Sequence, residues 1–464
     1  MFHLYNMKEM KEFLNISLLT LVAVASLSLA SCKNEVDQIF DEDAVTRLAK
    51  AQAEYVDILT SQGGRWQMQY FSNDNEPGYV YVMTFDKNGS VAISGMNKWI
   101  GIVDGVSSVG SKVAFGSATS MWDVIADNGP VLSFNTYNKY FHLFADPYDI
   151  PSENQGGSDF SGDTDTDESG YGHEGDYEFT IMKYSGDTLY LTGKKYNLDI
   201  IMVRINDAGY PGDEMYMNEV TAMADSFFNA KIPQAYINLP NGVRWIVKNG
   251  ASGILKMFRE GADEISTAET HNVIITHDGL SFMNPLTLDG YVIQNFILQA
   301  DGSLLCRDDH ETTMTADPLS MIFSNTGYTW RLDANQLGGN FAQLYSQIDT
   351  ELRAYQTRIL QYVQINYDTE LNCFSIRFNV KKGTSRFNPT WYFTIEPVGD
   401  NQMKITVAAE GDKTAQNYAE RCPSLRSFVD ALSGTLDLSA NSLLSPTCMR
   451  LTNGSGNYST WVLQ

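Results

Sequence analysis

A loop rich in glycine, serine and aspartate, residues 152–174, carries the side chains whose spacing most resembles a metal site. Its candidate ligands are Asp163, Asp165, Asp167 and Glu174. Alternating carboxylates followed by a terminal glutamate are the oxygen ligands of a calcium-binding EF-hand loop. Two features oppose calcium binding: Glu168 stands where the turn requires glycine, and the flanking segments have strand patterns rather than helical ones. The alternative, a disordered acidic loop with too little apolar surface to bury, is the one that we expect.

Aromatic residues flank or enter this loop: Trp122, Tyr137, Tyr140, Tyr171 and Tyr177. The candidate ligand contacts among them are Trp122, Tyr137 and Tyr171. Exposed rings beside carboxylates suit sugar binding, because a ring covers the apolar face of a pyranose and carboxylates accept hydrogen bonds from its hydroxyls. The alternative is core packing, which is the usual role of aromatic residues at strand positions. The polar, glycine-rich surroundings of Tyr171 favour exposure there.

Local catalytic motifs are absent from the sequence, which contains no Gly-x-Ser-x-Gly elbow, P-loop or dinucleotide-binding fingerprint. A hydrolase with two carboxylates from distant strands stays open, but nothing selects a pair among the 56 acidic residues. The formal net charge of −24 argues against nonspecific nucleic-acid binding, which requires clustered Lys and Arg. We expect no cofactor, with Ca²⁺ as the exception named above.

The first 31 residues have the pattern of a secretory signal peptide, in which Lys8 and Lys11 precede an apolar segment. That segment ends in Leu29-Ala30-Ser31-Cys32, which resembles a bacterial lipobox. Cys32 is then the lipidated N-terminus of the mature protein, and the membrane is a partner through this anchor. The alternative is an ordinary signal peptide with an incidental cysteine. Residues 32–42 form an acidic linker, which resembles a surface-export signal or only solvates the start of a helix.

Four further cysteines remain after lipidation: Cys306, Cys373, Cys422 and Cys448. An even number in an exported chain permits disulfides, and their spacing shows no metal-type clustering. We expect free thiols, and Cys422–Cys448 as the bridge if one forms.

Short strand patterns separated by turns dominate the rest of the chain. Apolar residues alternate in many segments, and Asp86-Lys87-Asn88-Gly89 predicts a hairpin because Asn-Gly accepts positive φ. The chain divides into a β-rich domain over 43–210, a second β-rich region over 211–332 and a C-terminal α+β region over 333–464, whose last helix is expected over 414–432. The predicted fold class is mainly β, with antiparallel barrel-like or sandwich-like domains and a few flanking helices.

Several segments together resemble the DUF4302 family: Phe40–Glu42, Gly64–Phe71, Phe85–Gly89, Gly129–Tyr137 and Gly175–Phe179. The resemblance is spread over residues 38–205. It implies a cell-envelope lipoprotein of Bacteroidetes, anchored to the outer membrane and exposed on the cell surface. Members are often encoded near nutrient-uptake systems of that membrane, so an uptake complex is an expected partner. The family supplies no catalytic residues.

These observations predict an accessory binding protein that captures a glycan or a peptide. The first alternative is a hydrolase of the same compartment whose active site is assembled from distant residues. The second is a structural or adhesive surface protein.

Overall fold

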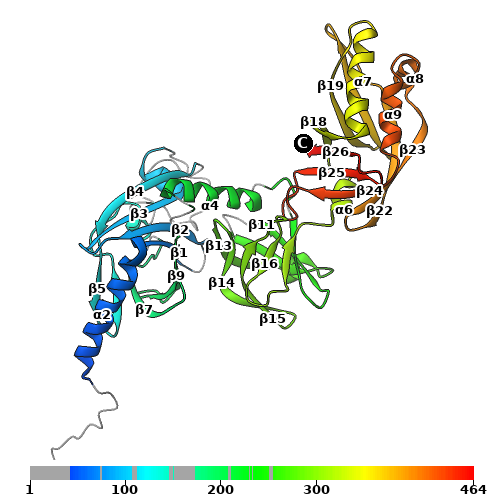
Figure 1. The fold of residues 1–464 in the computed structure, drawn as a ribbon. Coiled ribbons are helices and arrows are strands. Elements are labelled where there is room, and N and C mark those ends of the chain that lie inside the picture. The colour runs from blue at the N-terminus through cyan, green and yellow to red at the C-terminus, as the bar shows by residue number, and fades with distance from the viewer. Residues whose placement is uncertain are drawn as a thin grey trace, which may run out of the picture. The chain divides into compact units, whose positions relative to one another are not determined.

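The computed structural model describes residues 42–73, 76–106, 112–145, 150, 173–206, 209, 211–228, 230–232, 234–249 and 254–464. Residues 56–464 form one structural unit, and every contact discussed below lies within it. The described chain consists mainly of antiparallel strands, so the predicted fold class is confirmed. Figure 1 shows three β-rich domains coloured from blue to cyan, in green, and from yellow to red.

The first domain is a nine-stranded antiparallel sheet in the order β4-β3-β2-β1-β9-β8-β7-β6-β5. Its strands are β1 (Arg65–Tyr70), β2 (Tyr79–Phe85), β3 (Ser90–Asn97), β4 (Ala114–Met121), β5 (Asp123–Ala126), β6 (Pro130–Ser133), β7 (Glu178–Ser185), β8 (Thr188–Gly193) and β9 (Asp199–Arg204). Its helical segments are α2 (Ala44–Thr60), η1 (Ser61–Gly63), α3 (Lys98–Val103) and η2 (His142–Phe144). The hairpin predicted between β2 and β3 is present, and Gly89 occupies its turn at φ 85°.

Aromatic side chains fill the core of this domain. Tyr70 lies among them, with its ring centroid 5.3 Å from Phe141 and 5.6 Å from Phe144. Both phenylalanines are almost fully buried, and Phe144 belongs to η2. The core therefore fixes η2 against the sheet, although η2 has only three residues.

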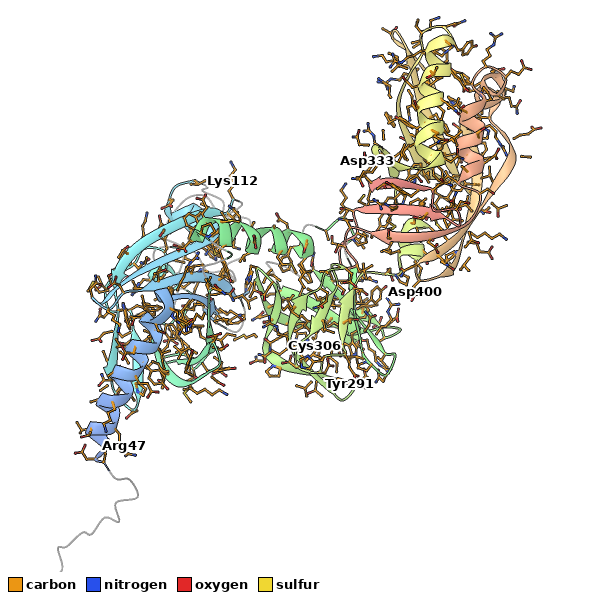
Figure 2. The ribbon with its side chains drawn as sticks, in the orientation of Figure 1. Arg47, Lys112, Tyr291, Cys306, Asp333 and Asp400 are labelled. Carbon is orange, nitrogen blue, oxygen red and sulfur yellow. The ribbon has the colours of Figure 1, made fainter. Side chains whose placement is uncertain are left out.

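Helix α4 (Asp213–Phe228) leads into the second domain, a closed barrel of eight antiparallel strands. These strands are β10 (Gln234–Asn238), β11 (Arg244–Asn249), β12 (Ile254–Arg259), β13 (Glu269–Thr276), β14 (Gly279–Leu288), β15 (Tyr291–Leu298), β16 (Leu304–Cys306) and β17 (Thr313–Thr315). The short helix α5 (Glu264–Thr267) lies between β12 and β13. Buried apolar side chains, including Cys306, form the barrel core, as expected for a barrel of this strand number (Figure 2).

The third domain follows the short helix α6 (Leu319–Phe323). Its strands are β18 (Trp330–Gly338), β19 (Ile359–Asp368), β20 (Cys373–Lys382), β21 (Ser385–Phe387), β22 (Thr390–Gly399), β23 (Gln402–Gly411), β24 (Gly434–Ala440), β25 (Cys448–Asn453) and β26 (Tyr458–Leu463). Pairing of β19 with both β18 and β20 closes this sheet into a ring, with β21 added at β20. Its helices are α7 (Asn340–Ala354), α8 (Lys413–Ala419) and α9 (Pro423–Ala431).

The single helix expected over 414–432 is wrong, because the structure has two helices there. Helix α8 ends at Ala419, and α9 starts at Pro423. Proline disfavours helical backbone at the residue before it and lacks the N–H that a continuous helix would need. Pro423 is therefore suited to the first position of a new helix.

Candidate ligand-binding site

Three rings lie in a row on the first domain, and we call Tyr137, His142 and Tyr177 the ring row. The ring centroid of His142 lies 5.6 Å from Tyr137 and 5.1 Å from Tyr177, with interplanar angles of 40° and 33°. The two outer rings face solvent, since Tyr137 is 57% exposed and Tyr177 is 43% exposed. Large exposed aromatic side chains placed together form a platform for the apolar face of a ligand.

The central ring of the row is held by two backbone contacts. The Asn138 N–H donates to Nδ1 of His142 at 3.1 Å, so this nitrogen must be the acceptor. Nε2 then carries the proton and donates to the carbonyl of Phe134 at 2.9 Å. Burial also lowers the pKa of His142 below its usual value, because it disfavours the charged imidazolium. His142 is therefore a neutral ring with both nitrogens engaged, suited to positioning the tyrosines rather than to proton transfer.

The segments that carry the ring row are joined by buried contacts. Phe134 N–H donates to the carbonyl of Tyr177 at 3.1 Å, and Gly175 N–H donates to the carbonyl of Phe144 at 2.9 Å. Beneath them, His173 Nδ1 lies 2.6 Å from Glu76 Oε2, with both side chains no more than 1% exposed. The ring of His173 packs 5.5 Å from Phe144. The ring row thus lies over these packed, buried side chains, which we call its foundation. They hold the rings in place before a ligand binds, as pre-organised binding requires.

A cleft of about 560 Å³ lies between the first domain and the barrel. One wall is the face of β7, β8 and β9, and the other comes from β13, β14, β15 and Arg307. Several lining side chains bear hydroxyl or amide groups: Thr188, Thr192, Ser281, Asn284, Gln294 and Asn295. The volume falls within the range of small-molecule sites, and hydroxyl and amide groups match the hydrogen-bonding of sugars or of peptide backbone.

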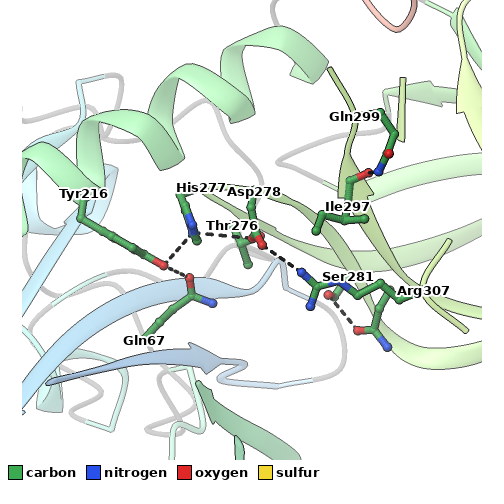
Figure 3. Close-up of polar contacts among 10 residues, drawn as sticks. Gln67, Tyr216, Thr276, His277, Asp278, Ser281, Ile297, Gln299 and Arg307 are labelled. Atoms are coloured by element: carbon green, nitrogen blue, oxygen red, sulfur yellow. Dashed lines mark hydrogen bonds and ion pairs between the residues drawn. The ribbon is translucent and has the colours of Figure 1, made fainter. Parts of the chain in front are cut away.

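Helix α4 fixes the two walls of the cleft relative to each other. The Tyr216 hydroxyl donates to Gln67 of β1 and lies 2.8 Å from Nδ1 of His277, which follows β13 (Figure 3). At the start of the same helix, Asp213 forms an ion pair with Arg65 at 2.8 Å. A shared apolar cluster includes Tyr216 and the barrel residue Ile274. The cleft is therefore pre-formed rather than dependent on a ligand to bring its walls together.

Two carboxylates line opposite walls of the cleft, Asp199 and Asp278. Asp278 already has both oxygens engaged: Thr276 donates to one at 2.9 Å, and Arg307 to the other at 3.0 Å (Figure 3). Asp199 accepts a hydrogen bond from Thr192 at 3.0 Å. A glycosidase needs one protonated carboxyl that is able to donate to the leaving group. With an arginine and a threonine donating to its two oxygens, Asp278 does not fit that role.

Of the aromatic residues predicted to contact a ligand, the structure places Tyr137 in the ring row. The exposed ring expected at Trp122 is wrong, because this side chain is only 5% exposed. Its indole N–H lies 3.0 Å from the carbonyl of Ser90, and its ring packs 4.9 Å from Phe85. Trp122 is the single residue between β4 and β5, which are the first and last strands in the order of the sheet.

The remaining predicted site residues lie mostly outside the described residues: Cys32, Asp163, Asp165, Asp167 and Tyr171. Glu174 is described, with a positive φ of 56° and partial burial. Among the described residues, no group of three or more His, Cys, Asp or Glu side chains is arranged to hold a metal ion. Within the same part of the chain, no helix is long and apolar enough to cross a membrane.

The four cysteines after Cys32 are free thiols, including the pair expected to bridge if a disulfide formed, Cys422 and Cys448. Burial raises the pKa of both Cys306 and Cys422 to about 11. At neutral pH these two groups are therefore protonated and poor nucleophiles.

His142 completes the site without being predicted from the sequence. Tyr177 stands out in the sequence as an aromatic residue beside the acidic loop, but nothing local pairs it with His142. Their approach depends on backbone contacts such as Phe134 to Tyr177, which join segments more than forty residues apart. The cleft is missed for the same reason, because its walls come from separate domains.

A family model described as domain of unknown function (DUF4302) matches residues 36–300. The match includes the ring row, α4 and both walls of the cleft except Arg307. No curated protein matches the sequence.

Solved structures that match the chain include two DNA polymerase β subunits and one DNA polymerase sliding clamp. The β subunit from Streptococcus pyogenes is 11% identical, covers 91% of this chain and 93% of its own, and has a TM-score of 0.13. The β chain from Streptococcus pneumoniae TIGR4 is 10% identical, with coverage of 87% and 91% and a TM-score of 0.10. The clamp from Caulobacter crescentus is 8% identical, with coverage of 90% and 96% and a TM-score of 0.10. TM-scores this low support no inference about fold or function.

Proposed function

Because the chain belongs to the DUF4302 family, whose description assigns no activity, we propose its function from its own surface: it binds glycan chains without cleaving them. The observation that carries this proposal is the ring row, in which Tyr137 and Tyr177 expose their rings on either side of a neutral His142. Each exposed ring offers a flat apolar face to one sugar unit, and the buried foundation keeps the rings in place.

The proposed location is the outer membrane, with the protein facing outward from a lipid on Cys32. A cell-surface glycan binder would then deliver its ligand to a neighbouring uptake system. Cys32→Ser removes the atom that carries the lipid, so we expect the variant to leave the membrane fraction when cells are fractionated. Full retention of Cys32→Ser in the detergent phase would contradict this location.

A ligand array tests the binding proposal. The form lacking residues 1–32 is applied to immobilised glycans and peptides, and the same ligands are incubated with it and analysed for cleavage products. We expect retention on a subset of glycans and no products. Retention on peptides alone would replace the glycan proposal with a peptide-binding one.

Cleavage is the second outcome that decides the function. Products that disappear in Asp199→Asn and Asp278→Asn would assign hydrolysis to the cleft. Asp127→Asn is the matched control, because Asp127 pairs with Lys194 and does not line the cleft.

A further inference from the structure

A buried cation without a counter-ion lies at one end of the third domain. Arg358, which directly precedes β19, is only 6% exposed. Its Nη1 donates to the carbonyl of Tyr355 at 3.1 Å, whereas its Nε is buried with no hydrogen-bond partner. A buried charge is unfavourable unless it is paired and hydrogen-bonded, so this guanidinium has capacity for an anion.

Aromatic rings, rather than carboxylates, surround this guanidinium. Its Cζ lies 3.9 Å from the ring centroid of Tyr355, 4.8 Å from Phe387 and 5.3 Å from Tyr418. The Tyr418 hydroxyl is also buried, and its O–H donates to no acceptor. A second buried donor beside the unpaired guanidinium is what an oxyanion would engage.

The nearby carboxylate of Glu351 on α7 does not pair with Arg358, because both of its oxygens accept hydrogen bonds from Ser424. One oxygen accepts the Ser424 hydroxyl at 2.7 Å, and the other accepts the Ser424 N–H at 3.0 Å. Throughout residues 319–464, all of which are described, Arg358 forms no ion pair. Within residues 319–464, therefore, no carboxylate neutralises this guanidinium.

Further cations that form no ion pair lie on the segments next to Arg358. The Arg421 guanidinium lies 5.2 Å from the ring centroid of Tyr355, and Lys382 donates to the side chain of Gln356 at 3.0 Å. Arg386 on β21 is directly opposite Lys381 on β20, and β21 also carries Phe387. None of these four cations forms an ion pair within the described third domain. Such a cluster is unusual on a chain with a net charge of −24, where acidic residues outnumber basic ones.

We propose that Arg358, Tyr418, Arg421 and Lys382 form an oxyanion-binding site for carboxylate, phosphate or sulfate groups. Arginine suits such groups because its planar donors match their geometry. This proposal does not rest on the ring row, since the site lies beyond residue 300, outside the family match. Its ligand is either a small free oxyanion or the acidic groups of a polymer such as a uronic-acid glycan.

Thermal melting and calorimetry of the full chain in detergent test the site. The probes are inorganic phosphate, sulfate and polygalacturonate, each compared with chloride at equal ionic strength and with a neutral galactan. We expect at least one oxyanion probe to raise the melting temperature. The affinity for that probe, measured by calorimetry, should be at least about tenfold lower in Arg421→Ala/Lys382→Ala, because charge-assisted hydrogen bonds are lost. Arg426→Ala is the matched control, since this arginine is already paired with Asp430 on α9.

Arg358→Met separates a binding role from a structural one. Without an oxyanion, this variant should melt no lower than the parent, because methionine fills the space and removes an unpaired buried charge. With the probe, its melting temperature should not rise. Response to phosphate or sulfate indicates a small-anion site, and response to polygalacturonate alone indicates an acidic polymer. No probe-specific response of the parent chain, or a full response in both variants, would overturn the proposal.

Discussion

Glu76→Ala should lower the free energy of unfolding of the first domain by about 3–5 kcal/mol, because it removes the buried carboxylate that contacts Nδ1 of the buried His173. Glu76 also accepts hydrogen bonds from Ser72 at 3.1 Å and Asn73 at 3.0 Å, so three groups lose an acceptor at once. Urea denaturation monitored by tryptophan fluorescence measures this loss, and the buried Trp99, whose ring lies 4.8 Å from His173, contributes to the signal.

An exposed ion pair provides the matched control for this prediction. Asp57 and Lys87 are 2.9 Å apart, but their side chains are 73% and 70% exposed. Asp57→Ala should therefore change stability by no more than about 1 kcal/mol. Equal losses for Glu76→Ala and Asp57→Ala would show that the buried pair does not stabilise the foundation of the ring row.

Trp122→Ala should also destabilise the first domain by about 3–5 kcal/mol, the usual cost of removing a buried tryptophan. The variant leaves a cavity beside Phe85 and removes the indole N–H that lies 3.0 Å from the carbonyl of Ser90. Trp122→Phe keeps an aromatic ring in place and should cost less than Trp122→Ala. The measurement is chemical denaturation of all three proteins.

Ligand affinity distinguishes this structural role from the binding role predicted for Trp122 by the sequence. Under conditions where Trp122→Phe remains folded, its affinity for a glycan ligand should stay close to that of the parent. If Trp122→Phe had parent-like stability but lost its affinity for the glycan, Trp122 would instead be a ligand contact.

Local patterns predict the strands but not how the sheets close. Alternating apolar residues and the turn at Asp86–Gly89 predict the β2–β3 hairpin, because both signals act within a few residues. No comparable local signal in the sequence predicts that β19 pairs with both β18 and β20, although this pairing closes the sheet of the third domain. Trp122 shows the same limit: the sequence places it near a polar loop, whereas its burial depends on contacts with Phe85 and Ser90 of neighbouring strand segments.

The candidate site was predictable only in part. Tyr137 stands out in sequence because it is an aromatic residue in a polar setting. Its partner His142 owes its orientation to the Asn138 N–H and the Phe134 carbonyl, and η2, which carries His142, is packed against Tyr70 by Phe144. The sequence likewise does not predict that Arg358 lacks an ion pair, since this depends on where every nearby carboxylate points.

The affinity of a glycan ligand for Tyr137→Ala/Tyr177→Ala, measured by calorimetry, tests the ring row directly. Both side chains are exposed, so the double variant should keep its fold. Each ring is expected to contribute roughly 1 kcal/mol or more of stacking, so affinity should fall at least about thirtyfold. Tyr362→Ala is the control, because this half-buried ring on β19 packs under Arg331 in the third domain. Parent-like affinity in the double variant, with folding intact, would contradict glycan binding by the ring row.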